Sequence, residues 1–343
     1  MDTWLSALAG DRDITALLSD QAQLDAMLAV ELALAGASAD CGFISDDAAA
    51  AISNAIAGFV PDDQALAAGM LQDGVVVPAL LRQLRPQVDP AHREALHKGS
   101  TSQDIIDTAL MLQLAKVFDI YEARLTGLLA ELEALAAGAG ERPLLAHTRM
   151  QAALPTLWRL KIESWSEPLR RHRQALTAMR RTLLVVQLGG PVGDRVSFEG
   201  HGNVIADGMA RRLDLGTASP WHATRDPVVA LGNLLALISG SLGKIGADIA
   251  LLAQTEVGAL RLEGAGGSSA MAHKANPVNA EVLVALARYN AGLSGTLAQA
   301  LVHEYERSGA AWTLEWLTLP PMLVTTGASL RLAIRLIEQI HLV

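Results

Sequence analysis

The feature that most constrains the fold is a long apolar segment between residues 227 and 262. Placed on a helix, this segment is apolar on several faces, as Val228, Val229 and Leu231 illustrate. A helix that is apolar all round has to be covered on all sides. A chain of 343 residues offers few helices to surround it, so we expect other subunits to do part of the covering.

The rest of the chain shows the same helical period. Apolar residues recur every three or four positions, as at Leu125, Leu128 and Leu132, which is the spacing of one helix face. Strand-like alternation is hard to find, and the best candidate, residues 75 to 77, is followed by a proline that argues against a central strand. A second long segment covers residues 149 to 188. Short loops make neighbouring helices antiparallel, so we expect an all-α, up-down bundle.

Charge and composition exclude several classes of protein. The chain has 27 basic and 36 acidic residues and a net charge of -9, the wrong sign for a protein that neutralises nucleic-acid phosphates. The longest uncharged stretch, residues 227 to 243, is shorter than a membrane span. The lone Cys41 excludes a disulfide framework, and the first 20 residues lack the pattern of a secretion signal. We expect a cytoplasmic protein without nucleic-acid or membrane partners.

A first polar loop, residues 96 to 104, precedes a helix that begins near Ile105. One interpretation is a helix cap, in which Ser102 is followed by Asp104 and Asp107 near the positive end of the helix dipole. A cap needs only one hydroxyl, however, and this loop gathers three hydroxyls and a glycine beside a histidine. Free backbone N–H groups at a helix start also bind carboxylates, so both interpretations stay open.

A second polar loop, residues 146 to 151, is expected to open the long helix that follows. One interpretation is purely structural: a threonine caps the helix, and the other polar residues are ordinary surface side chains. The alternative is that Arg149 and Gln151 bind a planar anion, because a guanidinium matches a carboxylate with two parallel hydrogen bonds.

A third loop, residues 264 to 277, is rich in glycine and then in polar groups. It is not a dinucleotide-binding loop, because a helix precedes it and Ser269 takes the place of the third glycine. A solvated linker would explain the glycines but not the serine pair, His273, Lys274 and Asn276. The pattern indicates a mobile lid that carries polar catalytic groups.

Two of these loops, in the same order, resemble conserved regions of the fumarase/aspartase superfamily. The third loop matches its signature through Gly267-Ser268-Ser269, Met271, Lys274, Asn276 and Glu281, and the first matches its first conserved region through His97, Gly99, Thr101-Ser102-Gln103-Asp104 and Asp107-Thr108. Residues 220 to 226, 240 to 244 and 304 to 316 are most similar to the bacterial carboxymuconate cycloisomerases of this superfamily.

The resemblance implies a cofactor-free homotetramer in which each active site takes one loop from each of three subunits. Because the histidines are scattered and do not cluster at ligand spacing, we also expect no metal. It also implies an N-terminal helical domain, residues 1 to 103, and a central long-helix domain, residues 104 to 343. The chain stops at Val343, so we expect it to lack the superfamily's small C-terminal helical domain. The implied reaction adds the carboxylate of a tricarboxylate substrate to its own diene through an aci-carboxylate.

The resemblance also assigns residues to the site. Ser268 is implied in proton transfer, while Lys274 and Asn276 would stabilise the charge that develops on a carboxylate. Substrate binding is implied for cationic, hydroxyl-bearing and amide side chains: His97, Thr101, Ser102, Arg149, Gln151, His222, Arg225 and Arg307.

Departures from the pattern keep two rival functions open. Arg149 occupies the position of a catalytic histidine in fumarases and adenylosuccinate lyases, which argues against those activities. Ala272 and Ala275 replace a proline and an arginine of close relatives, so a non-catalytic helical scaffold is one rival. Another lyase of the superfamily, such as one like adenylosuccinate lyase, is the other.

Overall fold

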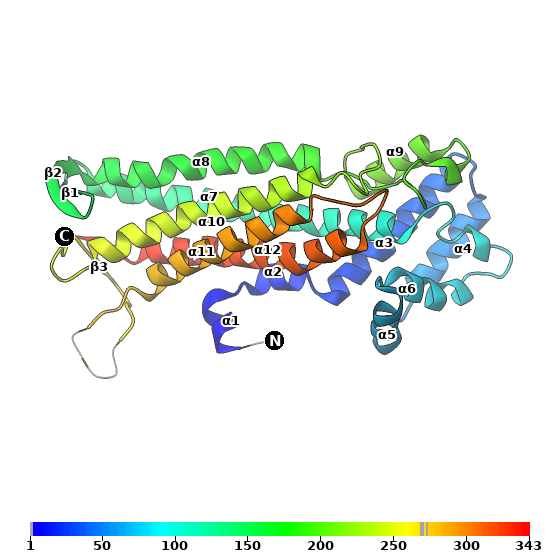
Figure 1. Cartoon of the computed structure of the whole chain (residues 1–343), viewed down its shortest axis with the longest axis horizontal. Coiled ribbons are helices and arrows are strands. Elements are labelled where there is room, and N and C mark those ends of the chain that lie inside the picture. The colour runs from blue at the N-terminus through cyan, green and yellow to red at the C-terminus, as the bar shows by residue number, and fades with distance from the viewer. Residues whose placement is uncertain (1–2, 268–270, 272–273) are drawn as a thin grey trace.

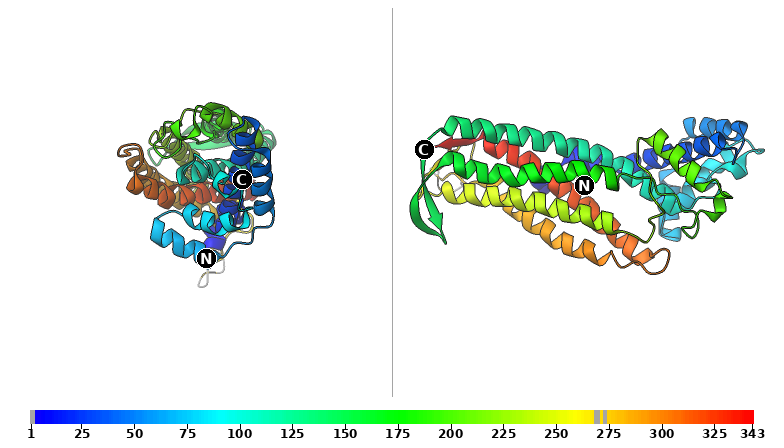
Figure 2. Two further views of the ribbon diagram at one scale, coloured as in Figure 1. Left: turned by 90° about the vertical axis from the view of Figure 1, so that its right-hand side faces the viewer. Right: turned by 90° about the horizontal axis from the view of Figure 1, so that it is seen from above.

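The structure is a computed structural model that describes residues 3–267, 271 and 274–343. Its body is an elongated bundle of long helices, in agreement with the all-α prediction (Figures 1 and 2). In the described part of the chain the bundle is built from α7 (Ser102–Ala139), α8 (Trp158–Leu183), α10 (Asp226–Leu252), α11 (Val278–Gln299) and α12 (Gly309–Glu338).

Helix α10 lies inside this bundle, as its apolar sequence requires. It packs against α8, α11 and α12, and Leu235, Ile238 and Leu242 on its inner faces are fully buried. Truncating such a leucine to alanine costs about 2–5 kcal/mol of stability. Leu237 and Leu251 on the same helix stay 59% and 41% exposed, so the residues that the structure describes do not cover every face of α10.

Three helices, α3 (Asp20–Asp40), α10 and α12, have the length and apolar composition that a membrane crossing would need. Between 50% and 67% of the apolar window in each helix is already buried inside the folded chain. In each of these helices, packing within the chain therefore buries at least half of the apolar window.

The second buried cluster lies at the other end of the molecule. It is formed by α3 and the start of α7 with the short elements α4 (Asp46–Ala57), α5 (Asp63–Asp73), α6 (Val77–Leu84), η2 (Arg93–Ala95), η3 (Val196–Phe198) and α9 (Gly202–Leu213). The short η1 (Arg85–Gln87) follows α6 directly. The short α1 (Trp4–Ala9) and α2 (Arg12–Leu17) lie beside the bundle. This cluster also takes Val186, Leu188 and Ile205 from later in the chain, and a domain boundary at residue 103 stays a prediction.

Residues 75 to 77 are not a strand. Val77 begins α6, and Pro78 lies in the first turn of that helix, where its missing N–H costs no hydrogen bond. The proline that argued against a central strand is thus a helix-start signal.

Strands occur at the opposite end, where a helix was expected. β1 (Pro143–Thr148) and β2 (Gln151–Leu157) form an antiparallel hairpin, and β3 (Leu260–Leu262) pairs with β4 (Ile340–Leu342). The prediction that residues 146 to 151 open a helix is therefore wrong. Arg149 and Met150 have φ angles of 49° and 64°, the left-handed values of a two-residue hairpin turn, and α8 begins only at Trp158.

Candidate active site

The predicted site residues fall into two groups at opposite ends of the bundle (Figure 1). Thr101 precedes α7, whereas the hairpin that carries Arg149 follows it. Helix α7 has 38 residues and therefore spans roughly 57 Å at 1.5 Å per residue. One copy of the chain does not bring these two groups together.

The group at the start of α7 contains His97, Thr101, Ser102, His222, Arg225 and Arg307. Arg307 Nη1 donates to Thr101 Oγ1 over 2.6 Å, and the Thr101 N–H donates to Asp104 Oδ2 over 3.0 Å. The N-terminus of α7 therefore has a capping box and a cation beside it, but the N-cap is Thr101, and Ser102, expected as the cap, is the first helical residue.

Asp104 connects three segments at this end. Besides Thr101, its buried carboxylate accepts hydrogen bonds from the N–H groups of Gly189 and Gly190, over 2.7 and 2.9 Å, and lies 2.8 Å from His222 Nε2. Gly190 has φ 74°, and a Cβ there would lie 2.9 Å from the Gly99 carbonyl oxygen. Asp104 thus organises the loops around Thr101, a role beyond capping.

His222 is buried behind this arrangement. A Cβ on Gly189 would lie 2.7 Å from His222 Cε1, so glycine is needed for the loop to approach the ring. Within the described residues, Nδ1 of His222 has no hydrogen-bond partner. Substrate binding by His222 stays a prediction.

Arg225 occupies a buried position between two carboxylates. Its guanidinium donates to both oxygens of Asp107, over 2.7 and 3.1 Å, and to both oxygens of Glu315, over 2.9 and 2.5 Å. Burial disfavours the charged form, but the two carboxylates outweigh burial and raise the pKa of Arg225 above its usual range. These contacts commit the donors of Arg225 to joining α7, α10 and α12, which argues for a structural role. Substrate binding by Arg225 stays a prediction.

The group at the other end contains Arg149, Gln151, Lys274 and Asn276; Ser268 lies outside the described residues. Arg149 and Gln151 are exposed at the tip of the β1–β2 hairpin. Asn276 closes the base of the third loop through paired backbone hydrogen bonds with Gly266, over 2.9 and 2.8 Å. Its Nδ2 donates to the Gly267 carbonyl over 3.3 Å, and Lys274 is exposed.

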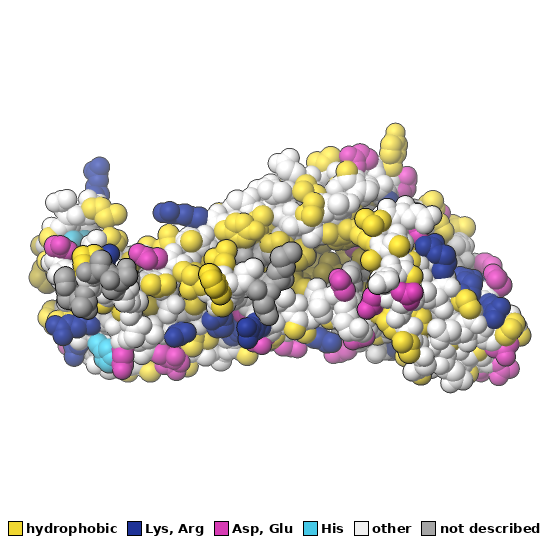
Figure 3. Space-filling model, turned by 90° about the horizontal axis from the view of Figure 1, so that it is seen from below, with side chains coloured by type: hydrophobic (Ala, Val, Ile, Leu, Met, Phe, Trp, Pro, Cys, Tyr) yellow, Lys and Arg dark blue, Asp and Glu magenta, His cyan; other side chains and the backbone are white. Residues whose placement is uncertain are grey.

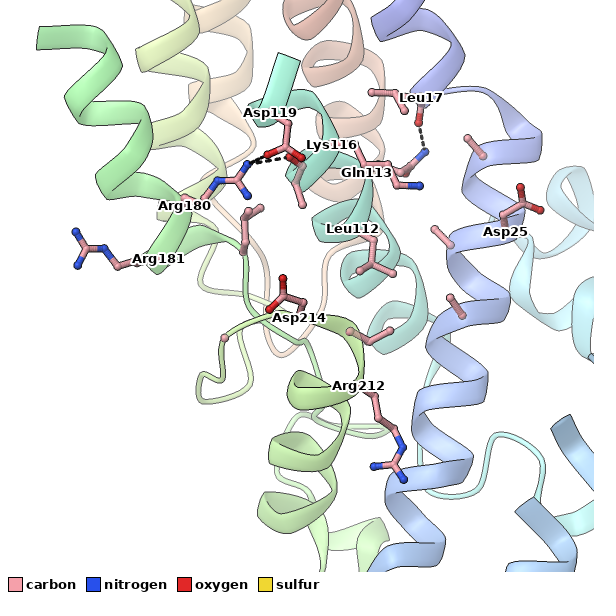
Figure 4. Close-up of a pocket in the computed structure, with 17 residues that line it drawn as sticks. Leu17, Asp25, Leu112, Gln113, Lys116, Asp119, Arg180, Arg181, Arg212 and Asp214 are labelled. Atoms are coloured by element: carbon pink, nitrogen blue, oxygen red, sulfur yellow. Dashed lines mark hydrogen bonds and ion pairs between the residues drawn. The ribbon is translucent and has the colours of Figure 1, made fainter. Parts of the chain in front are cut away.

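A groove of about 790 Å³ between α3, α7 and the ends of α8 and α9 is a different feature (Figure 4). Lys116, Asp119, Arg180 and Arg212 line it, and none of the predicted site residues does. Arg180 donates to Asp119 and to the Ala115 carbonyl. Its guanidinium therefore joins α8 to α7.

Comparison with known proteins defines the class. The profile of a family described as Lyase matches residues 13–290, and the chain belongs to this lyase family. It is 37% identical over 330 residues to a 3-carboxy-cis,cis-muconate cycloisomerase of Pseudomonas aeruginosa. The aligned region covers 94% of this chain and 72% of the relative. The crystal structure of 3-carboxy-cis,cis-muconate lactonizing enzyme from Pseudomonas putida superposes with a TM-score of 0.93 at 36% identity, over 100% of this chain and 78% of that one.

A relative named for a different reaction has a similar level of sequence identity to this chain. The chain is 36% identical over 348 residues to a nitrosuccinate lyase of Streptomyces davaonensis, with 97% of this chain and 73% of the relative covered. The resemblance to the fumarase/aspartase superfamily is confirmed, and the chain is an enzyme of the lyase superfamily.

Proposed function

We propose that this enzyme closes 3-carboxy-cis,cis-muconate to 4-carboxymuconolactone. The observation that carries the proposal is the similarity to proteins named for this reaction over nearly the whole chain, at 36–37% identity and a TM-score of 0.93. Arg149 supports it further, because a guanidinium replaces the histidine that fumarases and adenylosuccinate lyases have there.

Between the fully protonated forms the reaction is an isomerisation; the trianionic substrate takes up one proton as it becomes the dianionic lactone. A carboxylate oxygen of the substrate forms a C–O bond to one carbon of the diene. The displaced electron pair moves through the conjugated system onto another carboxylate, which becomes an aci-carboxylate. A proton then adds to the neighbouring carbon, and the lactone results. We assign the proton delivery to Ser268.

The charges of the site fit a trianionic substrate. The exposed cations Arg149, Lys274 and Arg307 come from three loops, and His97 adds a fourth group that can carry a positive charge. We infer that Lys274 and Asn276 act on the aci-carboxylate, since donors aimed at charge that develops in the transition state accelerate the reaction.

We infer that the two groups of site residues meet between subunits of a homotetramer. The roughly 57 Å between the ends of α7 supports this, because the loops of one copy lie too far apart to share a small substrate. Exposed apolar side chains on the bundle supply a surface for contact between copies, among them Leu237, Tyr289 and Leu317, which are 52–69% exposed. Figure 3 shows hydrophobic side chains distributed along the bundle on one face.

The test is an assay of purified protein with 3-carboxy-cis,cis-muconate, followed by loss of the diene absorbance. We expect turnover that survives dialysis against a chelator, because the described residues contain no group of histidine, cysteine and carboxylate side chains able to hold a metal ion. We also propose a cytoplasmic location, which fractionation of the source cells tests.

The second candidate is another lyase reaction, and the 36% identity to a nitrosuccinate lyase favours it. Fumarate release from nitrosuccinate or from a succinyl nucleotide, without loss of the diene, would support that function instead.

A further inference from the structure

Glu31 is a buried charge in the middle of an apolar helix. It is the one charged residue between Asp25 and Asp40 on α3, and it is 1% exposed. A carboxylate is rarely buried without a partner, because leaving water costs free energy that only a paired charge or hydrogen bonds offset. Glu31 therefore needs a specific partner.

That partner is His97, one of the residues expected to bind substrate. His97 Nδ1 lies 2.5 Å from Glu31 Oε1. Within the described part of the chain, the other oxygen of Glu31, Oε2, has no hydrogen-bond partner. The histidine is thus the only group in that part of the chain that offsets the buried charge of Glu31 by hydrogen bonding.

The backbone around His97 adopts an uncommon conformation. Its φ is 63°, in the left-handed region that residues other than glycine uncommonly adopt, although histidine, asparagine and aspartate do so more often than the rest. Neighbouring contacts hold the loop there: Lys98 Nζ donates to the Phe43 carbonyl over 3.1 Å, and Ser100 Oγ donates to the His97 carbonyl over 3.2 Å. Such strain persists only where the surroundings enforce it, and it clusters at functional sites.

The charges around the ring favour its protonated form. Burial opposes the charge, and Arg85 opposes it too, but Glu31 and Asp104 outweigh both and raise the pKa of His97. With Nδ1 committed to Glu31, Nε2 is the remaining donor of the ring. The side chain is 12% exposed, so the ring is not sealed off from a small ligand.

We propose that Glu31 is a positioning residue that holds His97 as an oriented imidazolium, so that its Nε2–H binds a carboxylate of the substrate. The inference rests on the proposed function, because it needs an anionic substrate at the start of α7. Glu31 itself does not touch the substrate.

Glu31→Gln tests the proposal, because it keeps the shape of the side chain and removes the charge. We expect KM to rise about tenfold or more, the loss of a charge-assisted hydrogen bond, with kcat changed less than twofold. The pH above which KM rises should move to a lower value than in the parent protein. His97→Gln should abolish that pH dependence, and adding Glu31→Gln to it should have little further effect.

The matched control is Asp25→Asn, which removes a carboxylate from an exposed position on the same helix. It should leave KM and its pH profile unchanged. If Glu31→Gln also leaves the profile unchanged, or if it lowers kcat at constant KM, the positioning role is wrong. Glu31→Asp, which keeps the charge on a shorter side chain, should retain part of the pH profile if Glu31→Gln does not fold.

A measurement without substrate separates this proposal from the proposed function. Histidines labelled at Cε1 can be titrated by NMR, with His97→Gln identifying the signal of His97. Glu31→Gln should lower the pKa of His97, and an unchanged pKa would overturn the pairing even in an active enzyme. If the pKa falls but the parent protein does not consume the diene, the pairing stands, and the proposed function and the substrate role of His97 both fail.

Discussion

Arg307 Nη1 donates a 2.6 Å hydrogen bond to Thr101 Oγ1, which joins the loop before α12 to the N-terminus of α7. The two residues are 206 positions apart. A cation, a hydroxyl and the first turn of a helix are therefore already assembled within one copy of the chain. Each of these groups binds carboxylates.

Arg307→Met and Thr101→Val should each raise KM, because each removes a group placed to bind the substrate. Their effects on kcat/KM should not add. Residues in direct contact show coupling energies of about 0.5–3 kcal/mol, and we expect a value in that range from steady-state kinetics of both single variants and the double variant. Additive effects would mean that the two side chains act separately.

Arg149→Asn should raise KM with kcat little changed, since Arg149 is proposed to hold a carboxylate rather than to move a proton. Asparagine tolerates the positive φ of 49° at this position, so the hairpin should remain folded. Met150→Gly is the control: it relieves the neighbouring φ of 64° and keeps the cation. A fall in kcat at constant KM in the asparagine variant would refute the binding role.

Arg225→Met should destabilise the protein by about 3–5 kcal/mol, because it leaves Asp107 and Glu315 buried without their partner. Denaturant unfolding measures this loss. Adding Asp107→Asn and Glu315→Gln to the same chain should restore much of the stability. If the Arg225→Met protein is instead stable and has a raised KM, Arg225 binds the substrate.

Asp248 should make the protein less stable in acid. Burial raises the pKa of this carboxyl, but hydrogen bonds from Lys244, Trp165 and Lys161 outweigh burial and hold it below the ordinary 3.8. The stability that it contributes is therefore present above pH 3.8 and is lost as the pH falls through the folded-state pKa. The free energy of unfolding of Asp248→Asn should differ most from that of the parent at neutral pH. A constant difference from neutral pH to below 3.8 would contradict this assignment.

The sequence predicts the long helices because burial alone specifies them. The apolar residues of α10 can satisfy their period only as a helix, and the structure agrees for Asp226–Leu252. The rest of the segment expected to be helical, residues 253 to 262, lies outside the helix, and Leu260–Leu262 is β3. The β1–β2 hairpin escapes such reasoning, because its turn residues Arg149 and Met150 are not the glycine and asparagine that favour positive φ. Pro155 lies within β2, paired with Leu145, where periodicity had placed a helix.

The sequence predicts which residues belong to the candidate site, but it does not predict which of them contact one another. The sequence pattern indicates that Asp104 and Asp107 are acids favoured by the helix dipole, but in the structure both are buried and organise His222 and Arg225. Glu31 lies among the buried residues of α3, and the helical period alone does not distinguish its position from those of the apolar core residues. The signal for it was a lone charge in an apolar run, and its partner, 66 positions away, is visible only in the fold.

The proposed reaction depends on active sites shared between copies of the chain, and a mixing experiment tests this sharing most directly. At a substrate concentration well below KM, Thr101→Ala, through a raised KM, and Ser268→Ala, through loss of proton transfer, should each be nearly inactive in the diene assay. Refolded together into tetramers, confirmed by size, they should regain about a quarter of the parent activity, because random assembly gives that fraction of sites two unmutated loops. No recovery in mixed tetramers would show that both loops serve the same subunit's site, and would contradict the account.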